Sequence, residues 1–239
     1  MADAGIEPGD RVVEVGAGLG SLTVALAEVA AEVLAVEADR TLVPALRESV
    51  AGLDGVRVVE ADALRLDWRT ELPGQPWRMV SNLPYNVAMP LVFRMLDEAP
   101  QVDRFLVMVQ REVGERMAAG PGVAAYGAAS VRLAYLAHVD VVRRVSASVF
   151  WPRPNVESVL VRIVPHEPPV DVGREDLFRV VEAGFAQRRK TMRNALVRLG
   201  LPAGAAAAAL EGCGLGADVR AEELGLAELA CLAEAAAGG

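Results

Sequence analysis

Residues 81–86, which read Ser-Asn-Leu-Pro-Tyr-Asn, carry the clearest chemical signal in the chain. The Asn82 side-chain carbonyl and the Leu83 main-chain carbonyl can accept the two hydrogens of an exocyclic amine. The nitrogen of such an amine is a poor nucleophile, and carbonyl dipoles aimed at it stabilise the positive charge that develops during reaction. The Tyr85 ring can stack on an aromatic base, and Pro84 stiffens the turn, which favours preorganisation. We therefore predict chemistry at an amine nitrogen.

A glycine-rich turn near the start of the chain suits a bound cofactor. Its glycines are Gly16, Gly18 and Gly20. Glycine lets the backbone turn tightly and lets a ligand approach where a Cβ would clash. The third position of the dinucleotide fingerprint G-x-G-x-x-G is Ser21 here, so that motif does not match. The observed spacing is common in Rossmann-like methyltransferases, although by itself it is a weak signal.

Two acidic residues strengthen the prediction of a cofactor site. Glu37 ends the second expected strand, where a carboxylate can accept both hydroxyls of a ribose. Asp62 follows the third expected strand, where a carboxylate can accept the amino group of an adenine. Taken singly, either could be a solvated acid at the start of a loop. The carboxyl ends of neighbouring parallel strands form one crevice, so the ordered set indicates a shared site.

The pattern of apolar runs predicts an α/β fold. Expected strands alternate with expected helices, which implies a parallel sheet with helices on both faces and a Rossmann-like domain over residues 1–165. Residues 165–169 read Pro-His-Glu-Pro-Pro and indicate a boundary, after which residues 170–239 show only helical patterns. Strands are expected at 11–15, 33–37, 56–60, 77–82, 104–110, 139–145 and 158–164. Helices are expected at 22–30, 42–50, 90–96, 128–135, 177–185, 189–199, from 203, and at 222–236.

Composition limits the class of protein. The net charge of −8 argues against nucleic acid as a partner, but residues 184–200 carry five cations and no acid. Phosphate binding needs a local basic face rather than a basic total. The start of the chain lacks the layout of a signal peptide, and no stretch resembles a membrane span. Cys213 and Cys231 have no metal-binding spacing, so reduced thiols, a cytoplasmic location and no metal are expected.

Several motifs together resemble one enzyme family. The string Asn-Leu-Pro-Tyr matches the (Asn/Asp)-x-Pro-(Tyr/Phe) motif of amino-group methyltransferases. Residues 150–158, Phe-Trp-Pro-Arg-Pro-Asn-Val-Glu-Ser, resemble the Phe-x-Pro-x-Pro-x-Val-(Asp/Glu)-Ser signature of the rRNA adenine dimethyltransferases. Residues 185–196 and 220–224 resemble the helical C-terminal region of the same group. The likeness to the small-subunit rRNA adenine-N6,N6-dimethyltransferases runs from about residue 9 to about residue 232.

The resemblance implies a substrate, a cofactor and a set of residues. The substrate would be two adjacent adenines in the 3′-terminal hairpin loop of small-subunit rRNA, dimethylated during ribosome assembly on an immature small subunit by a monomer. S-adenosyl-L-methionine would bind at Gly16, Gly18, Gly20, Glu37, Asp62 and Asn82. The catalytic set would be Asn82, Leu83, Pro84, Tyr85 and Phe150, with Phe150 facing Tyr85 across a flipped adenine. Phosphates would be bound by Arg143, Arg144, Arg153, Arg188, Arg189, Lys190 and Arg193.

Two alternatives remain open at this stage. One is a large-subunit rRNA adenine-N6 methyltransferase that confers antibiotic resistance, and the other is a non-catalytic RNA-binding factor for ribosome assembly. The second is raised by a departure from the family pattern. Members normally carry a Gly-Gln-Asn-Phe-Leu stretch before the first strand, and here ten residues without it precede Arg11. We expect either a truncated chain or a cofactor site that is open on one side.

Overall fold

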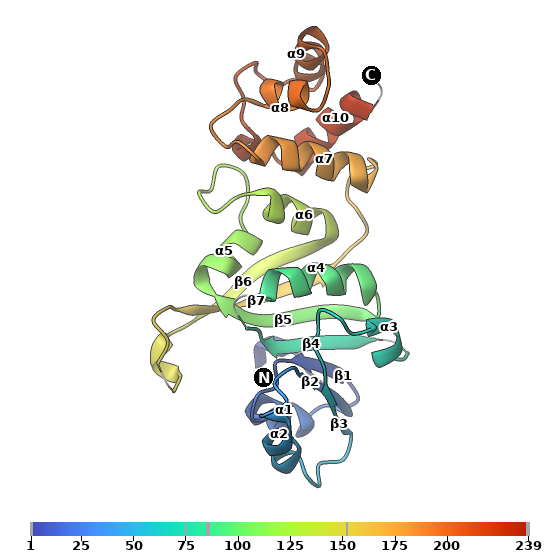
Figure 1. Cartoon of the computed structure of the whole chain (residues 1–239), viewed down its shortest axis with the longest axis vertical. Coiled ribbons are helices and arrows are strands. Elements are labelled where there is room, and N and C mark those ends of the chain that lie inside the picture. The colour runs from blue at the N-terminus through green and yellow to red at the C-terminus, as the bar shows by residue number, and fades with distance from the viewer. Residues whose placement is uncertain (1, 75, 85–86, 152, 238–239) are drawn as a thin grey trace. The chain divides into compact units, whose positions relative to one another are not determined.

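The computed structural model describes residues 2–74, 76–84, 87–151 and 153–237. In the described residues a seven-stranded sheet has the strand order β3-β2-β1-β4-β5-β7-β6 (Figure 1). The strands are β1 (Arg11–Val15), β2 (Glu32–Glu37), β3 (Val56–Glu60), β4 (Trp77–Asn82), β5 (Val102–Gln110), β6 (Ala137–Val145) and β7 (Ser158–Pro165).

The direction of the strands sets the position of the site. Strands β1 to β5 pair in parallel, and the order reverses between β1 and β4. Open α/β sheets bind ligands at such a reversal, beyond the carboxyl ends of the strands. The expected parallel sheet is confirmed for these five strands. It is wrong for β7, which pairs antiparallel with β5, because an apolar run has the same pattern in either direction.

The helices agree with most of the expected positions. Helix α8 begins at Met192 rather than at residue 189, because Lys190 N–H donates to the Gln187 carbonyl (2.9 Å) and closes a turn before it. The short α3 and α5 were not expected. The helices are α1 (Ser21–Ala27), α2 (Val43–Ser49), α3 (Trp68–Glu71), α4 (Ala88–Glu98), α5 (Arg111–Met117), α6 (Ala128–Leu136), α7 (Arg174–Phe185), α8 (Met192–Arg198), α9 (Ala203–Gly212) and α10 (Leu226–Ala237), with 3-10 turns η1 (Ala2–Ala4), η2 (Ala147–Val149) and η3 (Ala221–Glu223).

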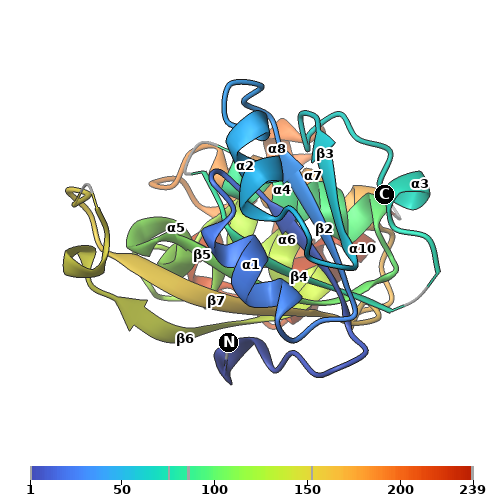
Figure 2. The ribbon, with the colours of Figure 1, turned by 90° about the horizontal axis from the view of Figure 1, so that it is seen from below.

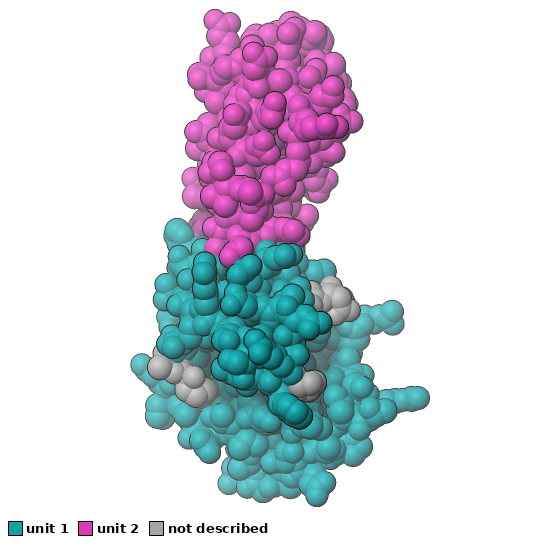
Figure 3. All heavy atoms as spheres, turned by 90° about the vertical axis from the view of Figure 1, so that its left-hand side faces the viewer, with its two compact units in different colours: residues 1–114, 138–165 teal, residues 115–137, 166–239 magenta. Residues whose placement is uncertain are grey.

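The chain divides into two compact units (Figure 3). Unit 1 comprises residues 1–114 and 138–165, and unit 2 comprises residues 115–137 and 166–239. The sequence suggested one boundary near residue 165, whereas residues 115–137 group with the C-terminal helices. The reason is packing within unit 2: Tyr135 of α6 meets Phe178 of α7 edge to face, and the Tyr126 hydroxyl donates to the Leu224 carbonyl (2.8 Å).

Each unit has its own apolar core. In unit 1, one face of the sheet packs Val12, Val33, Val80 and Leu106 against Leu26 of α1. All of residues 12–15 in β1 are buried, as expected for a parallel strand covered on both faces. In unit 2, the core gathers buried residues from α6, α7, α8, α9 and α10. Among the described residues, none of the helices has both the length and the hydropathy needed to span a bilayer.

The expectation of two reduced thiols is wrong for this structure. Cys213, directly after α9, and Cys231 in α10 form a disulfide with a Cα–Cα distance of 5.9 Å. The sequence separates them by 18 residues. Only the packing of α9 beside α10 brings the two sulfur atoms together, so spacing along the chain could not indicate the pair.

Candidate active site

The glycine turn after β1 lies against the turn after β4. Gly16 has φ +76°, and its N–H donates to the Val36 carbonyl (2.9 Å). A Cβ on Gly16 would lie 3.2 Å from Cδ of Pro84 and 3.6 Å from the Asn82 carbonyl oxygen. A positive φ and this close approach both favour glycine at the position. The fold therefore brings the two sequence motifs together at the point where strand order reverses.

Glu37 fixes the far side of the same turn. Its side chain is 8% exposed, and its Oε2 accepts a hydrogen bond from the Gly18 N–H (2.7 Å). Its Oε1 accepts from the Asp39 N–H (2.8 Å). A carboxylate has about four acceptor sites, so two hydrogen bonds leave capacity for a ligand. The end of β2 thus presents an oriented carboxylate beside the glycine turn.

A cavity of about 230 Å³ opens at the carboxyl ends of these strands. It is lined by three of the six residues predicted to bind a cofactor, namely Gly16, Glu37 and Asp62. Asp62 is held by the Leu64 N–H, which donates to its Oδ1 (2.9 Å). The remaining lining residues are mainly apolar: Val15, Val36, Ala38, Ala61, Ala63, Leu64, Pro84, Val87 and Leu91. An apolar cavity with a few convergent carboxylates suits a nucleoside-like ligand.

The motif predicted to be catalytic begins at the end of β4. Asn82 is the last residue of β4 and is exposed, and it does not line the 230 Å³ cavity, nor do Gly18 and Gly20. Leu83 is buried, and its N–H donates to the Met108 carbonyl (3.0 Å), which anchors the turn to β5. Pro84 lines the cavity. Tyr85 lies outside the described residues.

Sequence reasoning missed a buried polar group beneath the glycine turn. Glu14 in β1 is 2% exposed, and its Oε2 accepts a hydrogen bond from the Thr23 hydroxyl of α1 (2.6 Å). Burial raises the pKa of Glu14 to about 7, opposed by the Thr23 hydrogen bond and assisted by the charge of Glu37. Nearby, the Val15 N–H donates to the Ser81 hydroxyl (2.9 Å) and joins β1 to β4. The signal available in the sequence was a charged residue in the middle of an apolar strand.

Phe150 lies on a segment that leaves the sheet. Residues 146–157 connect β6 to β7 and project beyond the sheet in both views (yellow in Figures 1 and 2). Phe150 follows η2, is half-buried, and does not line the cavity that contains Gly16. Its predicted place opposite Tyr85 stays a prediction.

The predicted phosphate-binding residues of unit 1 differ in their pairing. Arg143 forms an ion pair with Asp3 (2.7 Å). Arg144 and Arg153 are exposed and form no ion pair with a described residue. The two unpaired arginines are better placed than Arg143 to bind a phosphate, because they need not give up an existing partner.

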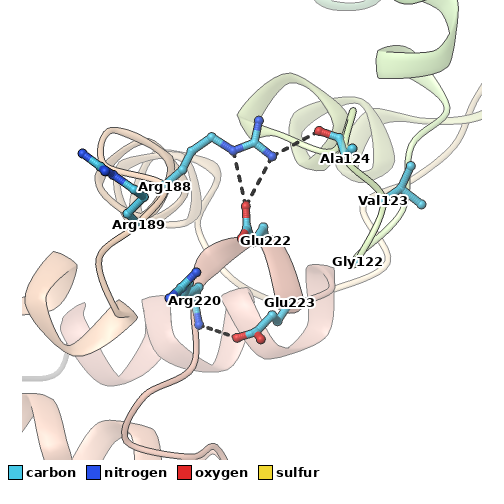
Figure 4. Close-up of a pocket in the computed structure, with 8 residues that line it drawn as sticks. All are labelled: Gly122, Val123, Ala124, Arg188, Arg189, Arg220, Glu222 and Glu223. Carbon is cyan, nitrogen blue, oxygen red and sulfur yellow. Dashed lines mark hydrogen bonds and ion pairs between the residues drawn. The ribbon is translucent and has the colours of Figure 1, made fainter.

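In unit 2 the basic cluster borders a cavity of about 640 Å³ (Figure 4). Arg188 is already engaged: it pairs with Glu222 (3.3 Å) and donates to the carbonyls of Ala124 (3.2 Å) and Tyr126 (3.1 Å). Figure 4 shows Arg189 pointing away from those partners. Arg220 also lines the cavity, although it was not predicted to bind RNA. Lys190 and Arg193 are exposed, and they do not line it.

Comparison with known proteins decides the family. Residues 1–237 match the family model described as Ribosomal RNA adenine dimethylase. The chain belongs to the ribosomal RNA adenine dimethylase family. The prediction of an S-adenosylmethionine-dependent rRNA adenine N6-methyltransferase with a Rossmann-like fold is thereby confirmed.

Curated relatives of this dimethylase cover nearly the whole chain. A protein of Thermobifida fusca named Ribosomal RNA small subunit methyltransferase A is 49% identical over 238 residues, which cover 97% of this chain and 82% of the relative. A protein of the same name from Geobacter sulfurreducens is 46% identical over 242 residues, covering 97% and 87%.

Solved structures share its fold. A dimethyladenosine transferase from Plasmodium falciparum superposes with a TM-score of 0.81 at 24% identity, over 96% of this chain and 90% of that one. The 23S rRNA methyltransferase ErmE superposes with a TM-score of 0.76 at 26% identity, over 98% and 93%.

Proposed function

We propose that this dimethylase transfers methyl groups from S-adenosyl-L-methionine to the N6 amines of two adjacent adenines in the 3′-terminal hairpin loop of small-subunit rRNA, as part of ribosome assembly. The curated relatives at 46–49% identity are named for the small subunit, which supports this substrate. The likeness to ErmE, a 23S enzyme, is weaker at 26% identity. We further propose that the enzyme acts as a monomer on immature small subunits in the cytoplasm.

The observation that supports the chemistry is the convergence of four strand ends on one cavity. Gly16, Glu37, Asp62 and Pro84 come from the ends of β1, β2, β3 and β4, and all line it. The residues fit the cofactor, because an oriented carboxylate at Glu37 can accept ribose hydroxyls and Asp62 can accept an adenine amino group. S-adenosylmethionine, when bound, supplies an electrophilic methyl group on a sulfonium sulfur.

The chain's own residues act on the adenine. We propose that the Asn82 side-chain oxygen and the Leu83 carbonyl accept the two N6 hydrogens and so direct the nitrogen lone pair toward the cofactor. Their dipoles stabilise the positive charge that builds up on the nitrogen. Pro84 keeps the turn rigid, and Tyr85 and Phe150 stack on the two faces of the base. The proposed roles need neither a metal nor a covalent nucleophile.

The proposed RNA contacts lie in both units. In unit 1 they are Arg144 and Arg153, and in unit 2 they are Arg189, Lys190 and Arg193. Such cations position the RNA through its phosphates and do not read its sequence. Arg143 and Arg188 carry existing partners, so we assign them weaker contributions than the sequence suggested.

The test is methyl transfer to ribosomal subunits that lack the modification. Radiolabelled S-adenosylmethionine should label adenines of purified small subunits and leave large subunits unlabelled. Asn82→Ala should lower kcat by about 10²–10³, the range found when one dipole aimed at a developing charge is removed. Asn82→Asp keeps an acceptor oxygen and should retain more activity than the alanine variant.

The other outcomes would contradict this proposal in different ways. Labelling of large subunits would favour the resistance enzyme. Tight binding to small subunits without any transfer would favour the assembly factor. Equal activity of the wild-type enzyme and Asn82→Ala would contradict the proposed mechanism even if the substrate is right.

A further inference from the structure

Trp151 is almost completely exposed, in contrast with the other tryptophans of the chain. Its exposed fraction is 97%, whereas Trp68 and Trp77 are 0% exposed. It lies on the segment between β6 and β7, next to Phe150, and Val149 and Val156 on the same segment are 67% and 40% exposed. Burying an indole ring has a large favourable free energy, which an exposed ring does not gain. A set of exposed apolar side chains of this kind therefore indicates a contact surface.

The charges around this segment indicate an anionic partner. Residues 141–156 contain three arginines and no acid. The nearest acids on either side are already paired, since Glu157 binds Arg111 (2.7 Å) and Asp140 binds Arg162 (3.0 Å). Arg144 and Arg153 form no ion pair with a described residue. The segment thus presents an exposed ring together with uncompensated positive charge.

An exposed aromatic ring beside unpaired cations is the arrangement with which proteins bind single-stranded nucleic acid. The ring stacks on a base of any sequence, and the cations bind the backbone. A lipid surface would be expected to meet more cations and a larger apolar area. A protein partner would more often cover an aromatic anchor together with apolar neighbours in a pocket.

We propose that Trp151 is a stacking platform for an unpaired RNA base beside the target adenine, with Arg144 and Arg153 binding the phosphates of that nucleotide stretch. The proposal rests on the proposed rRNA substrate and extends it. It makes Trp151 a positioning residue, because it contacts a neighbouring nucleotide and not the reacting atoms. Its removal should therefore raise KM for RNA and leave kcat nearly unchanged.

Fluorescence of the full chain tests the proposal directly. The two buried tryptophans are shielded from acrylamide, so the accessible fraction of the emission reports Trp151. A synthetic RNA hairpin with unpaired loop adenines should abolish that accessible fraction, and a fully paired RNA of equal length should not. Trp151→Ala should weaken hairpin binding by about 5- to 150-fold, equivalent to ~1–3 kcal/mol for one stacked base. Trp151→Phe should recover most of the affinity.

Val149→Ala is the matched control, because it removes another exposed apolar side chain from the same segment. It should bind the hairpin within about twofold of the wild type. Circular dichroism of each variant checks the fold, which an exposed side chain should not disturb.

Three results would overturn the proposal. The first is wild-type hairpin affinity in Trp151→Ala, and the second is a Trp151 that stays accessible to acrylamide in the complex. The third is an affinity loss confined to whole subunits, with binding of free RNA unchanged, which would mean a protein contact. Because neither readout involves methyl transfer, failure of the proposed function is seen separately from failure of this inference.

Discussion

At the scale of single residues, folding changes the ionisation of Glu14, whose pKa it raises to about 7. Among the described residues it forms no ion pair, and the hydroxyl of Thr23 is its hydrogen-bond donor. The cost of ionising it arises from burial, with a smaller contribution from the nearby charge of Glu37. Its carboxyl group links β1 to α1 directly under the glycine turn, so its protonation state bears on the stability of that turn.

We expect the free energy of unfolding of the dimethylase to fall as the pH rises from about 4.5 to about 7, and Glu14→Gln to remove much of that fall. The folded-state pKa of Glu14 is raised from 4.5 to about 7. The neutral form therefore favours the folded state fully below pH 4.5, and this contribution is lost as the pH passes about 7. The shift corresponds to about 3 kcal/mol at most.

Urea unfolding of both proteins between pH 5 and pH 8 measures the difference, with Glu60→Gln, an exposed acid at the end of β3, as the control for loss of one carboxylate. Parallel pH profiles for the wild type and Glu14→Gln would contradict the assignment. The sequence signals Glu14 only as a charged residue within an apolar strand. Its raised pKa could not be predicted, because that depends on a helix that packs over the strand. The acids at strand ends, Glu37 and Asp62, could be predicted, because their position along the chain fixes their place in the fold.

At the scale of elements, the turn after β1 must fit against the turn after β4. Gly16 and Gly18 both have positive φ, +76° and +57°. A Cβ on Gly16 would press on Pro84 at 3.2 Å, whereas a Cβ on Gly18 would meet nothing within 4 Å. The two positions therefore share the backbone cost of an L side chain, and only at Gly16 would the added Cβ contact the turn that contains Pro84.

This difference gives a matched pair of variants. Gly16→Ala and Gly18→Ala should each lose about 1–2 kcal/mol of stability from the left-handed backbone. Gly16→Ala should in addition lower methyl transfer, about tenfold or more, because a small displacement of the Pro84 turn misplaces the acceptors of the amine. Thermal unfolding and transfer assays on both proteins measure the two effects. Equal losses of activity would show that the contact with Pro84 is unimportant.

The turn between α7 and α8 contains two arginines, Arg188 and Arg189, that look equivalent in the sequence but differ in their contacts. Arg188 donates to the carbonyls of Ala124 and Tyr126 and pairs with Glu222, whereas Arg189 forms no hydrogen bond or ion pair with a described residue. We expect Arg188→Ala to destabilise unit 2 by about 1–3 kcal/mol, through the loss of charged hydrogen bonds. Arg189→Ala should leave stability unchanged and reduce the salt dependence of RNA binding by about one counterion.

Denaturant unfolding and RNA titrations over a range of salt concentrations distinguish the two arginines. Reversed results, with Arg189 needed for stability and Arg188 for binding alone, would contradict the structure. The sequence indicated a basic cluster but placed it on a helix. Pairing of Arg188 with Glu222, 34 residues further along the chain, depends on the tertiary fold and has no local signal.

At the scale of the whole molecule, the sequence predicts the layers better than the grouping of elements. Most expected strand bounds lie within two residues of the observed ones, because buried parallel strands are nearly continuous apolar runs. No sequence pattern indicates that residues 115–137 belong to unit 2, since the apolar residues of α6 could pack into either core. The functional division at residue 165 therefore stays a prediction, as do the site residues that only a bound ligand can test.

The disulfide lies within unit 2 and links two of its helical segments. Cys213 and Cys231 close a loop of 18 residues, and such a bridge stabilises a folded unit by ~3 kcal/mol in the chain-entropy account. A reducing cytoplasm would remove it, so the packing of α6 to α10 would then hold unit 2 together without a covalent link. We expect a reductant to speed amide hydrogen exchange in α9 and α10 and to leave exchange in β1 to β5 unchanged, as measured by mass spectrometry.

The double variant Cys213→Ser, Cys231→Ser should match the reduced protein and show no response to reductant. If the wild type also shows no response, or if both units respond equally, the bridge does not contribute to the stability of unit 2 in the way that its position suggests.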